Sequence, residues 1–403
     1  MPAPSRTIFC QLLSQRSQFL GKPALSSPGV MWKRPLPLVQ PTRRHTHLVG
    51  DRPIALITGV TGQDGGYLAA LLLQKGYVVH GIARDLSRLD RSRFEHILDV
   101  DRRLHLHVCD IVDAVSLARL LDEIRPDEIY NLAAQTHIQT SFEDPARTTD
   151  VNATGAVRLL SALVKSDPGR RTRYYQASSS EMFGDANGHI QDESSHFHPM
   201  NPYAVSKLAA YEATVNFREA FGVHASNGIL FNHESPWRGE RFVTRKISLA
   251  VARRHFGDTA LLKLGNLDTR RDWGHARDYV EGMWLMLQRD EPDDYVLATS
   301  EHHSVREFVE IAFGEIGRKL VWEGEGADEV GFDLESGDPL VAVDPTFFRP
   351  TDIGLTLGDA SKARQLLGWE CRTSFAQLVN EMVAADIRRF ELAKASGANQ
   401  PTI

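Results

Sequence analysis

The sequence is poor in the features that mark disulfide-linked, metal-binding or membrane proteins. It has only three cysteines among 403 residues, at positions 10, 109 and 371, and their spacing fits no zinc or dithiol site. This predicts reduced thiols in a reducing compartment, and no bound metal. No stretch approaches the about 18 consecutive apolar residues of a membrane helix, so we expect no membrane span. The histidines form no metalloprotease pattern, and His105 and His107 alternate in LHLHV, which predicts a structural pair on one face of a strand.

A strong net charge is also missing, since the 46 Lys and Arg are set against 52 Asp and Glu, for a formal charge of −6. The mild acidity disfavours a nucleic-acid partner, whose binding proteins usually have a basic face. It leaves phosphate ligands open, because local clusters of cations bind those. Residues 1–50 have no acidic residue but many Arg, Ser and Pro. We expect a disordered basic extension on a cytoplasmic protein, and an organellar transit peptide is the alternative.

Short apolar runs alternate with helical patterns from Ile54 to about Leu230. The candidate strands are residues 54–58, 77–82, 104–108, 128–133 and 173–178, and the candidate helices are 65–75, 116–124 and 153–165. This alternation predicts an α/β fold, a Rossmann-type doubly wound parallel sheet, over residues 51–240.

Residues 241–396 have a different pattern, in which loops separate helices expected near 244–254, 305–316, 361–367 and 374–395. We expect a smaller mixed α/β substrate-binding part there, interleaved with the first and covering the carboxyl edge of its sheet.

The segment TGVTGQDGG, residues 58–66, directly follows the first strand and precedes the first helix. Its Gly59, Gly62 and Gly65 are spaced GxxGxxG, and glycine lets the backbone turn tightly and approach a pyrophosphate. The following helix start offers free N–H groups and the positive end of its dipole. We therefore expect this loop, including Gln63 and Asp64, to bind a dinucleotide.

Residues at the next strand ends predict the form of that dinucleotide. A basic residue after the second strand favours NADP and an acidic one NAD, and here Arg84 and Asp85 are adjacent. We favour NADP through Arg84, with two solvated loop charges as the alternative. Asp110 follows the third strand, where it can meet the adenine ring. Leu132 and Ala134 follow the fourth, where small residues let the backbone lie along the cofactor.

Tyr203 and Lys207 form a Tyr-x-x-x-Lys pair on a helix that Asn201 can cap and Pro202 can begin. At this spacing the two side chains share a face of the helix. A tyrosine with a pKa of about 10 is a poor base at neutral pH, and a nearby ammonium group stabilises its phenolate. The pattern indicates a catalytic pair.

The strand at residues 173–178 runs into Ser178-Ser179-Ser180-Glu181. Sites of α/β sheets form at such carboxyl ends. A hydroxyl there can bind the substrate oxygen that Tyr203 deprotonates. Glu181 can remove a carbon-bound proton and return it to a leaving hydroxyl, and a plain loop glutamate is the alternative.

Together these motifs resemble the extended short-chain dehydrogenases/reductases, and the finer pattern resembles the GDP-mannose 4,6-dehydratase family. The matching stretches cover about Ile54 to Met382, and they are LITGVTGQDGGYLA, PDEIYNLAAQTHI, YYQASSSEMFG, NPYAVSKLAAY, GILFNHESPWRGERFVTRKI, LGNLDTRRDWGHARDYV and VDPTFFRP. The stretch around NHESP is the most specific, and it favours the dehydratase over a related GDP-sugar reductase or epimerase, the remaining alternative. A non-catalytic binding protein would have lost the catalytic residues, which are present here.

The resemblance implies the conversion of GDP-mannose to GDP-4-dehydro-6-deoxy-mannose and water, by internal hydride transfer through bound NADP, in a dimer or tetramer. It implies catalytic roles for Ser179, Glu181, Tyr203 and Lys207. It implies cofactor contacts for Lys207, His233 and Arg238. The GDP-mannose contacts that it implies are Asn232, Glu234, Arg245, Lys246, Arg271 and Arg349.

Ser179 stands at the family's catalytic threonine position, where its hydroxyl can do the same work. Three further departures are Asp85 and Trp237, which stand where the family has arginine, and Arg147, which stands where it has tyrosine. These departures leave the oligomeric state and the grip on the cofactor open.

Overall fold

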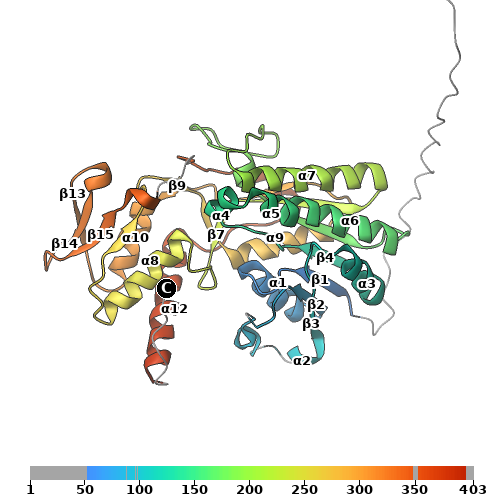
Figure 1. The fold of residues 1–403 in the computed structure, drawn as a ribbon, viewed down its shortest axis with the longest axis horizontal. Coiled ribbons are helices and arrows are strands. Elements are labelled where there is room, and N and C mark those ends of the chain that lie inside the picture. Colours follow the sequence, from blue (N-terminus) through green and yellow to red (C-terminus); the bar gives the residue numbers. More distant parts are fainter. Residues whose placement is uncertain (1–51, 88, 96, 98, 348–352, 396–403) are drawn as a thin grey trace, which may run out of the picture. The chain divides into compact units, whose positions relative to one another are not determined.

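The computed structural model describes residues 52–87, 89–95, 97, 99–347 and 353–395 (Figure 1). The expected N-terminal extension, Cys10 and Arg349 lie outside the described residues. In the described part of the chain, no helix combines the length and the apolar character needed to cross a membrane.

The main sheet has seven strands in the order β11-β6-β5-β4-β1-β2-β3. Its strands are β1 (Ile54–Thr58), β2 (Val78–Ala83), β3 (Leu104–Val108), β4 (Glu128–Asn131), β5 (Arg173–Ser179), β6 (His224–Leu230) and β11 (Tyr295–Leu297). All six pairings are parallel. The strand order reverses direction between β1 and β4, which is where sheets of this kind bind their ligands. The predicted Rossmann-type fold is confirmed.

Helices cover both faces of this sheet (Figure 1). On one face lie α1 (Gln63–Gln74) and α9 (Ala276–Gln288), and on the other lie α3 (Ala114–Ile124), α6 (Gly155–Ser166) and α7 (Pro202–Phe221). Strand β1 feeds both cores, because successive side chains of a strand point to opposite faces. Ala55 and Ile57 join the core under α1 and α9, and Leu56 joins the core under α3 and α6.

The helix starts differ from the predicted ones where a capping residue precedes them. Helix α1 begins at Gln63 and not at Gly65, because Gly62 is extended, with ψ 175°, and serves as its N-cap. Helix α3 begins at Ala114, since the Asp113 carboxylate accepts hydrogen bonds from the backbone of the first turn. Asn201 caps α7 as predicted, accepting from the Ala204 N–H.

A second core lies beyond the main sheet, at the end of the molecule drawn in orange and red in Figure 1. It contains a four-stranded mixed sheet in the order β13-β14-β15-β8. Its helices include α8, α10 and α12, each within a residue or two of the predicted span. The bounds are β8 (Leu262–Leu264), β13 (Leu320–Glu323), β14 (Val330–Asp333), β15 (Pro339–Val343), α8 (Val243–His255), α10 (Val305–Gly314) and α12 (Phe375–Ala395).

The chain passes between the two regions more than once. After α8 it returns to supply α9 and β11 to the main sheet before entering α10. The shorter elements are α2 (Val100–Arg103), α4 (Ile138–Glu143), α5 (Pro145–Thr149), β7 (Asn232–Glu234), β9 (Arg270–Arg271), β10 (Trp273–His275), β12 (His303–Ser304) and α11 (Ser361–Leu367). Strands β7 and β10 pair in parallel, so they connect the two regions next to the carboxyl ends of the main strands.

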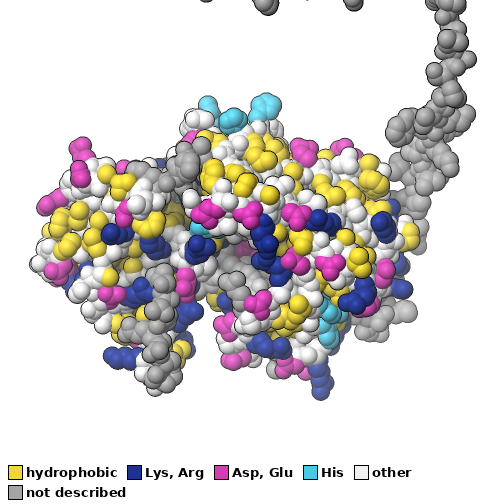
Figure 2. Space-filling view, in the orientation of Figure 1, with side chains coloured by type: hydrophobic (Ala, Val, Ile, Leu, Met, Phe, Trp, Pro, Cys, Tyr) yellow, Lys and Arg dark blue, Asp and Glu magenta, His cyan; other side chains and the backbone are white. Residues whose placement is uncertain are grey.

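The predicted histidine pair of β3 is confirmed, and it has a third member on β2. The His80 Nδ1 lies 3.0 Å from the His107 Nε2, and the His80 ring lies 4.8 Å from that of His105. Burial and the neighbouring histidines lower the pKa of His80 to about 4, and burial also lowers that of His107, so these two rings stay neutral at physiological pH. Elsewhere on the visible face, charged side chains of both signs are interspersed with apolar ones (Figure 2).

Candidate active site

The glycine loop closes tightly over the end of β1. Gly59 has a φ of +71°, and a Cβ placed on it would lie 3.0 Å from the backbone of Ala133. A Cβ on Gly65 would lie only 2.4 Å from the Gly59 carbonyl oxygen, which cannot move aside because it also accepts from the Gly62 N–H. No side chain caps the first turn of α1, so its N–H groups can bind an anion. The loop therefore suits a pyrophosphate.

A threonine that the sequence did not mark ties this loop to β4. The Thr58 hydroxyl donates to the Asn131 Oδ1 at 2.8 Å and accepts from the N–H groups of Leu132 and Ala133 at 3.0 and 2.9 Å. The segment that includes Ala134 is thus held beside the glycine loop, where the cofactor prediction placed it. Its sequence signal was the position of Thr58, the last strand residue before Gly59.

Two further hydrogen bonds of the loop reach across to β7. The Gln63 side chain donates to the His233 carbonyl at 3.0 Å and accepts from the Ser235 hydroxyl at 2.7 Å. The Asp64 carboxylate lies 2.9 Å from the His233 Nε2. Burial lowers the pKa of His233, but the Asp64 carboxylate more than offsets this and raises it. The predicted cofactor residues of the loop and of β7 therefore form one bonded unit.

Arg84 and Asp110 lie at the carboxyl ends of the neighbouring strands β2 and β3. Arg84 is exposed, and Asp110 is partly buried, with its carboxylate accepting from the Val112 N–H at 3.2 Å. Asp85 forms a local turn, accepting from the Ser87 N–H. Arg84 and Asp110 therefore lie at the same carboxyl edge of the sheet as the glycine loop.

The predicted catalytic residues meet where β5 ends. Ser179 is hydrogen-bonded to Tyr203 and also accepts from the Glu181 N–H at 3.3 Å. The Glu181 carboxylate accepts from the Asn201 side-chain amide at 2.9 Å. All four side chains are buried. A carboxylate, a hydroxyl and a phenol are therefore brought together in a buried setting.

Lys207 completes this set from the next turn of α7. Its ammonium group lies 5.8 Å from the Tyr203 ring centre and donates to the Ala177 carbonyl at 2.8 Å. Burial lowers the pKa of Lys207 to about 8, so it is still mainly charged at neutral pH. Burial raises the pKa of Tyr203 to about 12, against the effect of its hydrogen bond with Ser179. Deprotonation of Tyr203 therefore depends on positive charge nearby.

The Glu234 carboxylate of β7 is bound on both sides. It accepts from the Thr244 hydroxyl at 2.6 Å and lies 3.0 Å from the Arg238 guanidinium. The guanidinium also lies 3.6 Å above the Phe242 ring. Neighbouring Asn232 has a buried Oδ1 that meets no donor from the described part of the chain.

The predicted GDP-binding cations that the structure describes, Arg245, Lys246 and Arg271, differ in their contacts. The Arg245 guanidinium lies 2.6 Å from the Asp386 carboxylate of α12, with side-chain exposures of only 4% and 1%. Lys246, on the next position of α8, lies 3.5 Å from the Phe347 ring centre. Arg271 is buried in β9 and donates to the Arg270 carbonyl at 2.9 Å. Asp386 was not marked by the sequence, because a carboxylate in the middle of a helix shows nothing of its distant partner.

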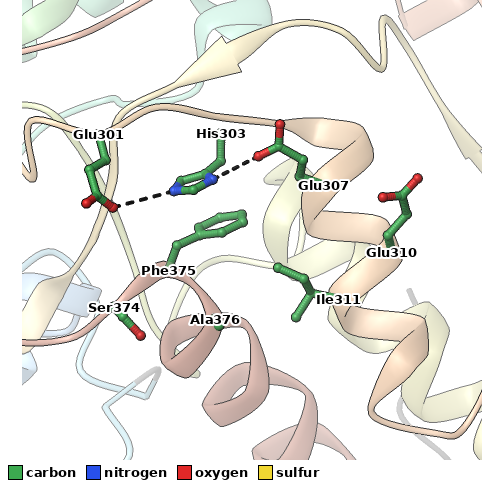
Figure 3. Close-up of a pocket in the computed structure, with 8 residues that line it drawn as sticks. All are labelled: Glu301, His303, Glu307, Glu310, Ile311, Ser374, Phe375 and Ala376. Atoms are coloured by element: carbon green, nitrogen blue, oxygen red, sulfur yellow. Dashed lines mark hydrogen bonds and ion pairs between the residues drawn. The ribbon is translucent and has the colours of Figure 1, made fainter.

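A pocket of about 350 Å³ lies between β12, α10 and α12, and its lining residue His303 pairs with Arg271 across β12 and β9 (Figure 3). The His303 ring stacks on Phe375 at 3.9 Å, and its Nδ1 lies 2.8 Å from the Glu307 carboxylate. Glu310 accepts from the Trp322 indole at 2.8 Å. These polar groups bind one another, so the pocket is explained by the packing of α10 on α12.

Comparison with known sequences gives one consistent result. The model of the family described as GDP-mannose 4,6 dehydratase matches residues 56–382. The GDP-mannose 4,6-dehydratase of Sinorhizobium fredii is 54% identical over 341 residues, covering 84% of this chain and 97% of that protein. The human GDP-mannose 4,6 dehydratase is 50% identical over 341 residues, covering 83% and 92%. An Arabidopsis thaliana relative, GDP-mannose 4,6 dehydratase 1, is 51% identical over 354 residues, covering 86% and 92%.

Solved structures resemble this fold at lower identity. A Thermotoga maritima UDP-glucose 4-epimerase with UDP-glucose has a TM-score of 0.70 at 20% identity, covering 84% of this chain and 99% of that one. The Streptomyces venezuelae dTDP-glucose 4,6-dehydratase with bound NAD has a TM-score of 0.70 at 22% identity, covering 84% and 98%. These likenesses concern the fold alone.

Proposed function

The chain belongs to the GDP-mannose 4,6-dehydratase family and is a hydro-lyase, and we propose that the buried set at the end of β5 removes water from GDP-mannose. One arrangement carries this proposal: the Glu181 carboxylate lies beside the Ser179 and Tyr203 hydroxyls, with Lys207 on the same helix as Tyr203. A reductase that only moves a hydride has no need of that carboxylate. An elimination needs one to take the proton from carbon 5 and give it to the oxygen that leaves carbon 6.

We propose that the glycine loop holds NADP, with Arg84 meeting the 2′-phosphate at the end of β2. The tight loop, the open first turn of α1 and the Thr58 bonds to the β4 segment fit a dinucleotide. Bound by these residues, the cofactor would supply the hydride-transfer chemistry that links carbon 4 and carbon 6 of the mannosyl group. Asp110 then lies toward the adenine, and the pair formed by Asp64 and His233 keeps the loop against β7.

The chain's own residues move the protons. Tyr203 takes the proton of the carbon-4 hydroxyl, and Ser179 binds that oxygen. The resulting ketone acidifies the proton on carbon 5, which Glu181 removes. The electrons of that C–H bond form the C5–C6 double bond, the C6–O bond breaks, and Glu181 protonates the departing hydroxyl so that it leaves as water. Tyr203 finally protonates carbon 5, and Lys207 stabilises its phenolate before the first of these transfers and after the last.

For the GDP part we propose that Lys246 and Arg271 bind the diphosphate, together with Arg349, which lies outside the described residues. The buried pairing of Arg245 with Asp386 supports a different contribution, in which Arg245 fixes α8 so that Lys246 is correctly placed. Asn232 and Glu234, next to the glycine loop on β7, would line the sugar side of the site. Arg238 would contact the cofactor from the same segment.

Two variants test the separate proton-transfer roles of Tyr203 and Glu181. Tyr203→Phe should abolish turnover and leave GDP binding unchanged, because it removes only the phenol. Glu181→Gln should still oxidise carbon 4 but should not exchange the carbon-5 hydrogen with deuterated water. Retained turnover in the first variant, or normal exchange in the second, would remove that residue from its role.

The NADP preference has its own test. Arg84→Ala should weaken NADP binding by about 10-fold or more and leave NAD binding unchanged, because only NADP presents a phosphate for a charge-assisted contact. Equal weakening of NADP binding and NAD binding would argue against a contact between Arg84 and the 2′-phosphate. We also propose a homo-oligomer, a dimer or tetramer, which sedimentation of the purified protein would distinguish.

A further inference from the structure

We propose that Asn201 is a positioning residue of the elimination, holding one oxygen of the Glu181 carboxylate so that the other one moves the proton. This rests on the proposed function of Glu181. The sequence marked Asn201 only as the cap of α7, and the structure gives its side chain a second contact at the reacting carboxylate.

Both ends of the Asn201 amide are engaged. Its Oδ1 accepts from the Ala204 N–H at 2.8 Å, as the N-cap of α7, and its Nδ2 donates to the Glu181 Oε2 at 2.9 Å. Asn201 is 6% exposed and Glu181 is 8% exposed, so water cannot replace either contact. A flipped amide would lose the helix cap. The cap therefore fixes the amide so that it always presents an N–H to Glu181.

This contact connects the two residues that transfer protons, Tyr203 and Glu181. Asn201 directly precedes the turn of α7 that carries Tyr203, while Glu181 follows β5 and donates its N–H to Ser179. Glu181, Ser179 and Tyr203 are thus connected to Asn201 by hydrogen bonds and by the first turn of α7. The position of the carboxylate relative to the phenol is set by α7, and not by the loop alone.

The elimination requires the Glu181 carboxylate to be held in place. In the proposed elimination one carboxylate takes the proton from carbon 5 and gives it to the oxygen leaving carbon 6. These two positions are adjacent on the sugar, so the carboxylate must stay in place between the two transfers. The amide donor of Asn201 occupies the Oε2 of Glu181 without adding a charge. The remaining oxygen faces the substrate.

The test separates the two contacts of Asn201. Asn201→Ser keeps a good cap for the Ala204 N–H but is too short to reach Glu181. We expect kcat to fall by about 10- to 100-fold at nearly constant KM, as for the loss of a hydrogen bond to a charged group. Oxidation at carbon 4 should continue, and reduced cofactor should accumulate in a single turnover.

A second variant and a control keep the result interpretable. Asn201→Asp keeps the shape and the cap but replaces the donor by a second carboxylate, and it should lower kcat further. Asp113→Ser changes the N-cap of α3 in the same way at an exposed position and should leave kcat unchanged.

Two results would overturn the proposal. One is a wild-type kcat for Asn201→Ser, without accumulation of reduced cofactor, while Glu181→Gln is inactive. The other is a uniform loss of carbon-4 oxidation, GDP affinity and thermal stability, which would indicate a purely structural cap. Failure of the wild-type protein to release water from GDP-mannose would instead refute the proposed function itself.

Discussion

The buried ion pair between Arg245 and Asp386 makes a quantitative prediction. It joins α8 to α12 at 2.6 Å, and the Ser248 hydroxyl also donates to Asp386 at 2.7 Å. Burial lowers the pKa of Arg245 and raises that of Asp386, so each charge is retained mainly because of the other. Asp386→Asn keeps the size of the side chain and removes its charge, leaving the arginine buried without a counter-charge.

The expected loss is about 3–5 kcal/mol in the free energy of unfolding, the usual cost of removing one partner of a buried pair. The unfolding entropy of a chain of this size is about 0.7 kcal/mol/K, so the melting temperature should fall by about 4–7 °C. The paired replacement Arg245→Met with Asp386→Leu removes both charges and keeps apolar volume. It should recover most of that loss, because burying the two charges is itself costly.

Scanning calorimetry of the three proteins, with GDP binding by titration, distinguishes the two roles of Arg245. If Arg245 only places α8, the double variant should bind GDP nearly as well as the wild type. If Arg245 contacts the diphosphate, GDP affinity should fall even where stability is recovered. A melting temperature for Asp386→Asn within about 1 °C of the wild type would refute the energetic reasoning.

Three further predictions follow from the cofactor side of the site. Turnover should decline as pH rises through about 8, where Lys207 loses its proton, and a profile that stays flat to pH 10 would contradict that role. Gly65→Ala should abolish cofactor binding in a fluorescence titration, because its Cβ would lie 2.4 Å from the Gly59 carbonyl oxygen, and normal affinity would count against the tight loop. His233, whose pKa is raised, should stabilise the fold fully below the ordinary histidine pKa of about 6.5 and lose this as pH rises through its higher folded value. Melting curves of the wild type and Asp64→Asn should therefore differ most at acidic pH and converge at alkaline pH.

Much of the fold could be predicted, because its main sheet is built from local patterns. The strand at residues 54–58 has the predicted bounds, since a buried parallel strand shows as an apolar run between breakers. The edge strand at residues 104–108 also has them, since the alternation in LHLHV indicates a strand. The antiparallel pairing of β13 and β14 was not predicted, because these short strands are only partly buried and carry no clear alternation. The place of β11 in the main sheet depends on a tertiary return of the chain, which leaves no local signal.

The site residues also divide into those that a local pattern predicts and those whose contacts depend on tertiary packing. Tyr203, Lys207 and the glycine loop follow from spacing within one helix or one turn, so the sequence was sufficient to mark them. The contacts made by Asp386 with Arg245 and by Asn201 with Glu181 join residues 141 and 20 positions apart. Only the packing of α12 on α8, and of α7 on the end of β5, brings these partners together.

The most direct test of the account is to incubate the purified protein with GDP-mannose, without added NADPH, and to follow the nucleotide sugar by mass spectrometry. We predict a product lighter by one water that carries a new keto group, formed over many turnovers with no external reductant. Unchanged GDP-mannose, together with turnover of a GDP-keto-sugar only when NADPH is supplied, would contradict it and identify a reductase.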